Sequence, residues 1–162
     1  MELLPVTGQR IAQTAVFASE VFIDYYTPLI GEKQARYMAD LFLSERAIAK
    51  LIDDGAVFET VVHDGEIIGF CEYKKEGRRL FLSKLYVRKD HRHEGVGSFM
   101  WKKIRSYAEN NNLDSIYLTV NKGNTPSYEI YKHLGFKVID AVVNDIGQGY
   151  VMDDYIMEYA MK

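Results

Sequence analysis

The stretch RHEGVG, Arg92 to Gly97, separates two segments of different character. The run before it, LFLSKLYV at 80–87, is rich in residues that favour a strand. The segment after it, SFMWKKIRSYAENN at 98–111, repeats apolar residues at helical spacing. A helix N-terminus carries N–H groups that lack partners within the helix, together with a partial positive charge. A glycine-rich loop that leads from a strand into a helix can therefore bind phosphate.

The side chains of this loop suit a pyrophosphate. Gly95 and Gly97 would allow an anion to approach the main chain, Arg92 can add a charged fork, and the Ser98 hydroxyl is a further donor. Taken alone, Gly-x-Gly after a strand also fits a simple tight turn. The stretch lacks the Gly-Lys-Ser/Thr of a nucleoside triphosphate loop and the third glycine of a dinucleotide fingerprint, so it predicts neither of those sites.

The first third of the chain has helical periodicity. Apolar residues recur at three- and four-residue steps from about Gln9 to Phe22, and we expect Pro28 to end that helix or to begin a break. Two further helices are predicted at 32–43 and 45–53, with Ser44 as the cap of the second.

The pattern then changes to that of strands. The segment 57–74 places Asp64-Gly65 between two runs rich in Val, Ile and Phe, which predicts a hairpin, and EGRR at 76–79 turns the chain into the third strand. A helix and the strand 115–120 follow, which predicts a parallel crossover. Thr125 is expected to cap a helix that has Pro126 at its first position and that Gly135 ends. The last two extended runs are 136–143 and 150–160.

Composition narrows the functional classes. The 162 residues fit one domain, 1–162, and the net charge of -3 disfavours nucleic acid as a partner. Cys71 is the one cysteine, which excludes an intramolecular disulfide and favours a reducing cytoplasm. No apolar run approaches the roughly 18 residues of a membrane span, so we expect no membrane partner. His91 and His93 have no third ligand in the sequence pattern, and we expect no metal.

Two motifs together resemble the GNAT superfamily of acyl-CoA-dependent N-acyltransferases. The central signature of that family, Arg or Gln, two residues, Gly, one residue and then Gly or Ala, is matched by Arg92, Gly95 and Gly97. The companion signature is an asparagine several residues before a tyrosine that precedes Gly-Phe, and it is matched by Asn124 and Tyr131 before Gly135-Phe136. The resemblance covers roughly residues 57–140. It implies a three-layer α/β/α fold with a mixed, mostly antiparallel, twisted central sheet, in which the N-terminal helices at 9–53 help to form an acceptor pocket.

The resemblance also implies roles for individual residues. The strand residues would hydrogen-bond the pantetheine arm of acetyl-CoA, the loop would bind the pyrophosphate through main-chain N–H groups, and two further residues would lie beside the arm. These coenzyme-binding residues are Leu85, Tyr86 and Val87 on the strand, Arg92, His93, Glu94, Gly95, Val96, Gly97 and Ser98 in the loop, and Asn124 and Ser127. Tyr131 matches the family tyrosine that protonates the departing thiolate and also contacts the coenzyme.

The implied reaction is transfer of acetyl from acetyl-CoA to the primary amine of a small molecule or peptide, by direct attack in a ternary complex. Relatives often carry a carboxylate on the strand before the loop, where this chain has Ser83 and Lys84. Glu72 on the adjacent predicted strand is therefore the candidate base, and the alternative for it is an exposed strand glutamate. Two other functions stay open: a noncatalytic acyl-CoA-binding sensor or assembly module, and a nucleotide-phosphate-binding protein. The resemblance also allows a homodimer.

Two further segments are unusual. Tyr25, Tyr26 and Tyr37 could form an acceptor wall or could be ordinary helix packing. Asp153-Asp154 interrupts a predicted strand, and the pair suits either a cationic amine or the charged edge of a sheet.

Overall fold

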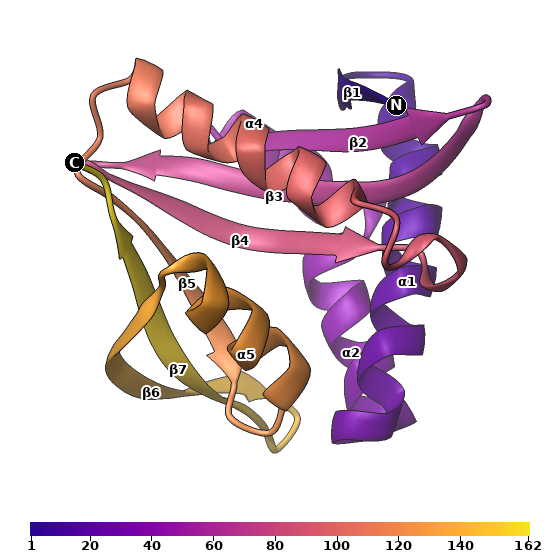
Figure 1. Ribbon diagram of the computed structural model, residues 1–162. Helices are drawn as coiled ribbons and strands as arrows, with labels where there is room; N and C mark the ends of the chain where they lie inside the picture. Colours follow the sequence, from indigo (N-terminus) through magenta and orange to yellow (C-terminus); the bar gives the residue numbers. More distant parts are fainter. The chain divides into compact units, whose positions relative to one another are not determined.

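The computed structural model describes residues 1–162 (Figure 1). The helices are α1 (Arg10–Ile30), α2 (Glu32–Leu43), α3 (Glu45–Asp53), α4 (Val96–Asn110) and α5 (Thr125–Leu134), with a 3₁₀ turn η1 (Lys89–His91). The strands are β1 (Glu2–Pro5), β2 (Val57–His63), β3 (Glu66–Glu76), β4 (Arg79–Val87), β5 (Ser115–Asn121), β6 (Lys137–Gly147) and β7 (Tyr150–Ala160). None of the helices combines the length and the apolar character that crossing a membrane requires.

The seven strands are hydrogen-bonded in the order β1-β2-β3-β4-β5-β7-β6. Pairing is parallel between β4 and β5, and it is antiparallel in β1–β2, β2–β3, β5–β7 and β6–β7. The parallel pair is the one that α4 connects, as the strand, helix, strand pattern predicts. The prediction of a mixed, mostly antiparallel sheet is thus confirmed.

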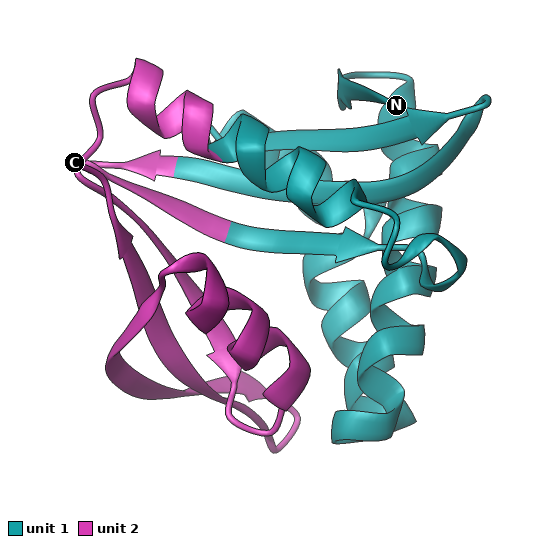
Figure 2. Cartoon of the chain, viewed as in Figure 1, with its two compact units in different colours: residues 1–74, 83–104 teal, residues 75–82, 105–162 magenta.

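The chain forms two compact units, shown in teal and magenta in Figure 2. Unit 1 comprises Met1–Lys74 and Ser83–Ile104, and unit 2 comprises Lys75–Leu82 and Arg105–Lys162. Strands β3 and β4 and helix α4 each contribute residues to both units.

In unit 1, helices cover both faces of the strands. The ring of Phe70 on β3 meets the ring of Phe17 on α1 edge-on, with the centroids 6.1 Å apart. A Cβ atom added to the neighbouring Gly69 would lie 3.3 Å from side-chain atoms of Met100 and Val96, which belong to α4. Successive residues of a strand point to opposite faces, so α1 and α4 lie on opposite sides of β3. The Tyr86 carbonyl would be only 3.1 Å from the same Cβ, which explains the glycine.

In unit 2, the turn that ends α5 directs the chain into the core. Gly135 adopts the left-handed conformation at the helix C-terminus, with φ of 110°. The turn places the next residue, Phe136, in the interior, where its ring lies 5.5 Å from that of Tyr131 and 5.6 Å from that of Tyr159. Leu118 on β5 and Met157 on β7 are buried in the same unit.

Three sequence-based expectations about local structure are corrected. Pro28 lies inside α1, which loses one N–H donor there and continues for less than a turn before Gly31 ends it at φ 88°. The cap of α5 is Asn124 and not Thr125, because the Asn124 side chain accepts the Ser127 N–H. Asp153-Asp154 does not interrupt β7, which runs unbroken from Tyr150 to Ala160.

One strand was not anticipated. Residues Glu2–Pro5 pair antiparallel with β2, and four residues are too few to display a period of two in sequence.

Candidate functional site

Constraints within the chain explain only one of the two glycines in the loop between β4 and α4. Gly95 has φ of 83°, a left-handed conformation that favours glycine, so the tight turn accounts for it. Gly97 has no such constraint, and a Cβ atom there would meet only side-chain atoms of Leu85 and Val87 at 4.0 Å, an ordinary contact. Neither conformation nor crowding within the chain therefore requires a glycine at position 97. A small residue at this position keeps the surface of the helix N-terminus open.

The first turn of α4 presents unbonded main-chain donors. The Phe99 N–H donates to the Gly95 carbonyl at 2.9 Å, and it is the first N–H group of α4 that forms a helical hydrogen bond. The N–H groups of Val96, Gly97 and Ser98 precede it, and the chain supplies no acceptor for them. These donors and the positive end of the helix dipole form a site for an anion.

The charged residues of the loop divide into paired and unpaired groups. Arg88 contacts the carboxylates of Asp90 at 2.7 Å and Glu66 at 3.5 Å, and His91 contacts Glu94 at 2.9 Å. Arg92 has no carboxylate partner. Its Nε donates to the Val87 carbonyl at 3.2 Å, and its guanidinium carbon lies 5.2 Å from the centre of the Tyr25 ring. Arg92 is thus the loop arginine whose charge is left for an anion.

The remaining loop residues are exposed. His93 has φ of 65°, the left-handed conformation, and both His93 and Glu94 face solvent. Their side chains are therefore not needed for packing, which is consistent with the predicted contribution from main-chain groups alone.

The predicted pantetheine strand lies next to this loop. Pairing of β4 with β5 joins Arg79, Leu80 and Phe81 to residues 115–117 and extends no further. Leu85, Tyr86 and Val87 therefore lie beyond the parallel pairing, on the segment that leads directly into the loop. The Tyr86 hydroxyl lies 2.9 Å from the hydroxyl of Tyr26 on α1, a hydrogen bond that joins this segment to the first helix.

The candidate base Glu72 is buried and forms an ion pair. The alternative from the sequence, an exposed glutamate on a strand, is therefore wrong. Lys84 Nζ lies 2.5 Å from Glu72 Oε1 and donates to the Ser83 hydroxyl at 3.2 Å. The side chains of Glu72 and Lys84 are only 4% and 10% exposed. This pair was not predicted from the sequence. A signal was present, because Glu72 precedes the Gly77-Arg78 turn by nearly the same number of residues as Lys84 follows it, and residues at equal distances from a turn face each other on neighbouring strands.

The other predicted coenzyme-binding residues belong to unit 2. Asn124 is buried at the N-terminus of α5, where its side-chain oxygen accepts the Ser127 N–H at 3.3 Å. Tyr131 lies two turns further along the same helix, half-buried against the Phe136 ring. The structure thus brings Leu85–Val87, Arg92–Ser98 and Glu72 together in unit 1, and Asn124, Ser127 and Tyr131 together in unit 2.

The two carboxylates of the acidic pair on β7 lie in different environments. Asp153 contacts Lys122 Nζ at 3.1 Å, whereas Asp154 is 5% exposed. Burial, followed by the nearby negative charge of Asp153, raises the pKa of Asp154 to about 6.

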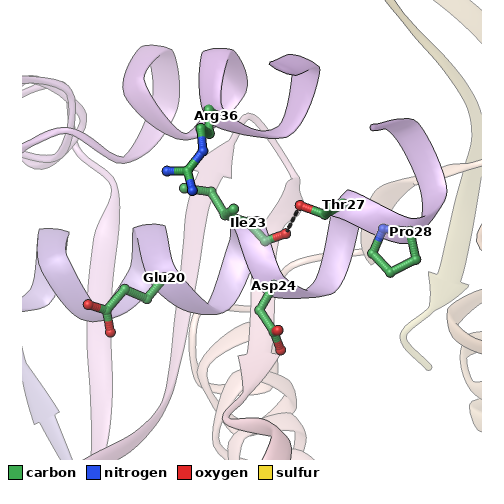
Figure 3. Close-up of a pocket in the computed structure, with 6 residues that line it drawn as sticks. All are labelled: Glu20, Ile23, Asp24, Thr27, Pro28 and Arg36. Carbon is green, nitrogen blue, oxygen red and sulfur yellow. Dashed lines mark hydrogen bonds between the residues drawn. The ribbon is translucent and has the colours of Figure 1, made fainter. Parts of the chain in front are cut away.

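A hollow of about 450 Å³ lies on unit 1 between α1 and α2 (Figure 3). It is lined by Glu20, Ile23, Asp24, Thr27, Pro28 and Arg36. With 3.6 residues per turn, Glu20, Asp24 and Thr27 project from the side of α1 opposite to Phe22 and Tyr25. Both of those rings contact the Tyr86 ring with centroids 6.0 Å apart, so the hollow lies on the far side of α1 from β4. Its position separates it from the loop at 92–98.

Comparisons with known proteins agree with this geometry. The Acetyltransferase (GNAT) family matches residues 18–136. Over 147 residues, which are 90% of this chain and 94% of the relative, the chain is 25% identical to an uncharacterised N-acetyltransferase of Mycobacterium tuberculosis. It is 30% identical over 92 residues to a tyramine N-feruloyltransferase of Nicotiana tabacum, a match that covers 57% of this chain and only 38% of the tobacco protein.

The fold has a counterpart among solved structures. The PaiA N-acetyltransferase of Thermoplasma acidophilum, solved in complex with coenzyme A, superimposes with a TM-score of 0.78 at 19% identity, over 99% of this chain and 100% of that one. The mixed sheet with its glycine loop at a helix N-terminus thus defines the fold of the acyl-CoA N-acyltransferases. The family match extends over most of the chain, and the chain belongs to the GNAT acetyltransferase family. The resemblance that the sequence motifs indicated is confirmed.

Proposed function

We propose that the chain transfers an acetyl group from acetyl-CoA to the primary amine of a small molecule or peptide. The observation that carries the proposal is the anion site at the N-terminus of α4. Free N–H groups of Val96, Gly97 and Ser98 meet there with Arg92, an arginine without a carboxylate partner. A pyrophosphate supplies the charge and the acceptor oxygens that this set of donors requires.

The chemistry needs one bond to form and one to break. The neutral amine nitrogen attacks the thioester carbonyl carbon, the carbon–sulfur bond then breaks, and coenzyme A leaves as a thiolate. The nitrogen loses a proton and the thiolate gains one. We propose Tyr131 as the donor to the thiolate, since a phenol is acidic enough to protonate a thiolate and basic enough to be reprotonated.

We propose Glu72 as the group that accepts the proton from the amine. Its partner Lys84 donates a hydrogen bond to Oε1. In this proposal the second carboxylate oxygen accepts the proton, directly or through a water molecule.

Direct transfer is supported by the state of the lone cysteine. Cys71 is fully buried, and burial, together with the negative charges of Glu59 and Glu72, raises the pKa of its thiol far above the ordinary value. A thiol in this state is a poor nucleophile. The proposed reaction therefore proceeds in a ternary complex without an acyl-cysteine intermediate.

The name of one relative supports the proposed class of acceptor. The chain spans less than two-fifths of the tobacco relative, whose name gives tyramine as the acceptor and feruloyl as the acyl group transferred. We therefore propose a primary amine as the acceptor and take acetyl as the acyl group to test first.

The experiment is release of free thiol from acetyl-CoA in the presence of single amines: tyramine, spermidine, an aminosugar, free amino acids and short peptides. Feruloyl-CoA serves as the second donor. We expect saturable turnover with one class of amine, and a variant with Tyr131→Phe is the matched control for catalysis at the thiolate. Absence of coenzyme A binding in calorimetry would overturn the proposal.

A second candidate is a noncatalytic acyl-CoA-binding module. It is favoured by the Glu72–Lys84 ion pair, which engages the candidate base. Tight acetyl-CoA binding together with no turnover of any amine would select this function over catalysis.

A further inference from the structure

The guanidinium of Arg92 is held by contacts that leave its charge intact. One of its five N–H donors is used, from Nε to the Val87 carbonyl at 3.2 Å. The Tyr25 ring lies 5.2 Å from the guanidinium carbon, within the range of a cation–π interaction. The donors on the two terminal nitrogens have no acceptor in the chain.

The neighbouring arginine shows the contrast. Arg88 directs its guanidinium to the carboxylates of Asp90 and Glu66, which take up two of its donors and offset its charge. An aromatic ring orients a guanidinium without taking its in-plane donors, because the ring interacts through its face. Arg92 is thus ordered and still able to bind an anion.

The Tyr25 ring is itself supported on several sides. It meets the Tyr26 ring edge-on with centroids 5.0 Å apart and lies 6.0 Å from the Tyr86 ring. Tyr26 is in turn packed on Phe22 at 4.6 Å and hydrogen-bonded to the Tyr86 hydroxyl. This cluster joins α1 to the end of β4, directly before the loop that carries Arg92. A platform fixed in this way loses little conformational freedom when a ligand binds.

We propose that Tyr25 is a positioning residue that preorganises Arg92 for the pyrophosphate of the coenzyme. The proposal rests on the proposed function, because it takes coenzyme A as the occupant of the anion site. It places a determinant of coenzyme affinity on α1, outside both family motifs. The sequence by itself indicates only an acceptor wall or ordinary helix packing for Tyr25.

The test is a double-mutant cycle measured by calorimetry with coenzyme A as the ligand. The variants are Tyr25→Ala, Arg92→Ala, the double variant, and Tyr25→Phe, which keeps the ring. We expect Tyr25→Ala to weaken binding about three- to tenfold, the size of a partly exposed cation–π interaction, and Tyr25→Phe to leave it within about twofold. In the double variant we expect no loss beyond that of Arg92→Ala, because the ring acts only through the guanidinium.

Arg88→Ala is the matched control, since Arg88 is the loop arginine already engaged by carboxylates, and we expect it to change affinity less than twofold. Losses that add in the double variant would show that Tyr25 acts independently of Arg92 and would overturn the inference. Unchanged affinity in Tyr25→Ala with a clear loss in Arg92→Ala would overturn the inference and leave the proposed function standing. Unchanged affinity in Arg92→Ala, or no binding of coenzyme A to the wild type, would overturn both. If Tyr25→Ala fails to fold, Tyr25→Leu takes its place in the cycle, because leucine fills much of the space of the ring but has no aromatic face, and we expect the same loss of affinity.

Discussion

Lys84 and Glu72 form a buried ion pair, with Lys84 Nζ 2.5 Å from Glu72 Oε1 and both side chains at least 90% removed from solvent. The pair stands on β4 and β3, and β4 leads into the loop at 92–98. Two charges removed from water are tolerated because each compensates the other, so removing one leaves the other uncompensated.

We therefore expect Lys84→Met to lower the free energy of unfolding by about 3 kcal/mol, because the Glu72 carboxylate is left buried without a cation. Chemical denaturation at pH 7 measures the change. The combined variant Glu72→Gln, Lys84→Met removes both charges and should recover much of the loss. Arg78→Ala breaks the exposed pair with Asp114 and serves as the control, with an expected change of less than about 1 kcal/mol. Equal effects of the buried and the exposed variants would contradict the assignment of a structural pair.

In the loop at 92–98, Gly97→Glu should abolish acetyl-CoA binding, because the longer side chain fills the approach to the N-terminus of α4 and adds a negative charge. Gly97→Ala is the matched control. Its Cβ would make only ordinary contacts at 4.0 Å, so we expect affinity close to that of the wild type. Isothermal calorimetry compares the two, and full affinity in the glutamate variant would remove the anion site from the proposal.

Replacement of Tyr131 by Phe tests the proposed proton donor. We expect turnover to fall at least tenfold while acetyl-CoA affinity stays within about twofold, because only the hydroxyl is lost and the ring still packs on Phe136. Tyr128→Phe, on the same helix, is the control and should leave turnover nearly unchanged. An equal loss of turnover and affinity in Tyr131→Phe, or no loss of either, would indicate that Tyr131 only packs.

The buried carboxyl of Asp154 gives a prediction for pH. Its pKa is about 6 in the folded chain against an ordinary value of 3.8, so the folded state holds this proton more tightly than the unfolded state. The stability contributed by this group therefore falls as pH rises from about 4 to about 6, and the penalty persists above that range. The penalty is on the order of 3 kcal/mol at neutral pH.

Asp154→Asn should accordingly raise the free energy of unfolding above pH 7 and have little effect at pH 4, as measured by denaturation at several pH values. Asp153→Asn is a useful comparison, because the charge of Asp153 contributes to the raised pKa of Asp154. The asparagine at 153 should move the pH dependence toward lower pH without removing it. A stability difference for Asp154→Asn that is the same at pH 4 and pH 8 would contradict this account.

The order of elements and the loop residues followed from the sequence because their signals are local. Alternation along 115–120, the Asp64-Gly65 turn and the helical spacing after Ser98 each concern a few neighbouring residues. The motif residues Arg92, Gly95 and Gly97 are also close together in the chain, so the motif can be recognised without the fold. The fold class and the family follow from these features together.

The tertiary structure decided which distant side chains meet. The contact of Arg92 with Tyr25 and the burial of Glu72 against Lys84 depend on how α1 and the strands pack in unit 1. Local periodicity states which face of an element is apolar, but not which partner covers it, because that choice depends on packing between segments far apart in the chain.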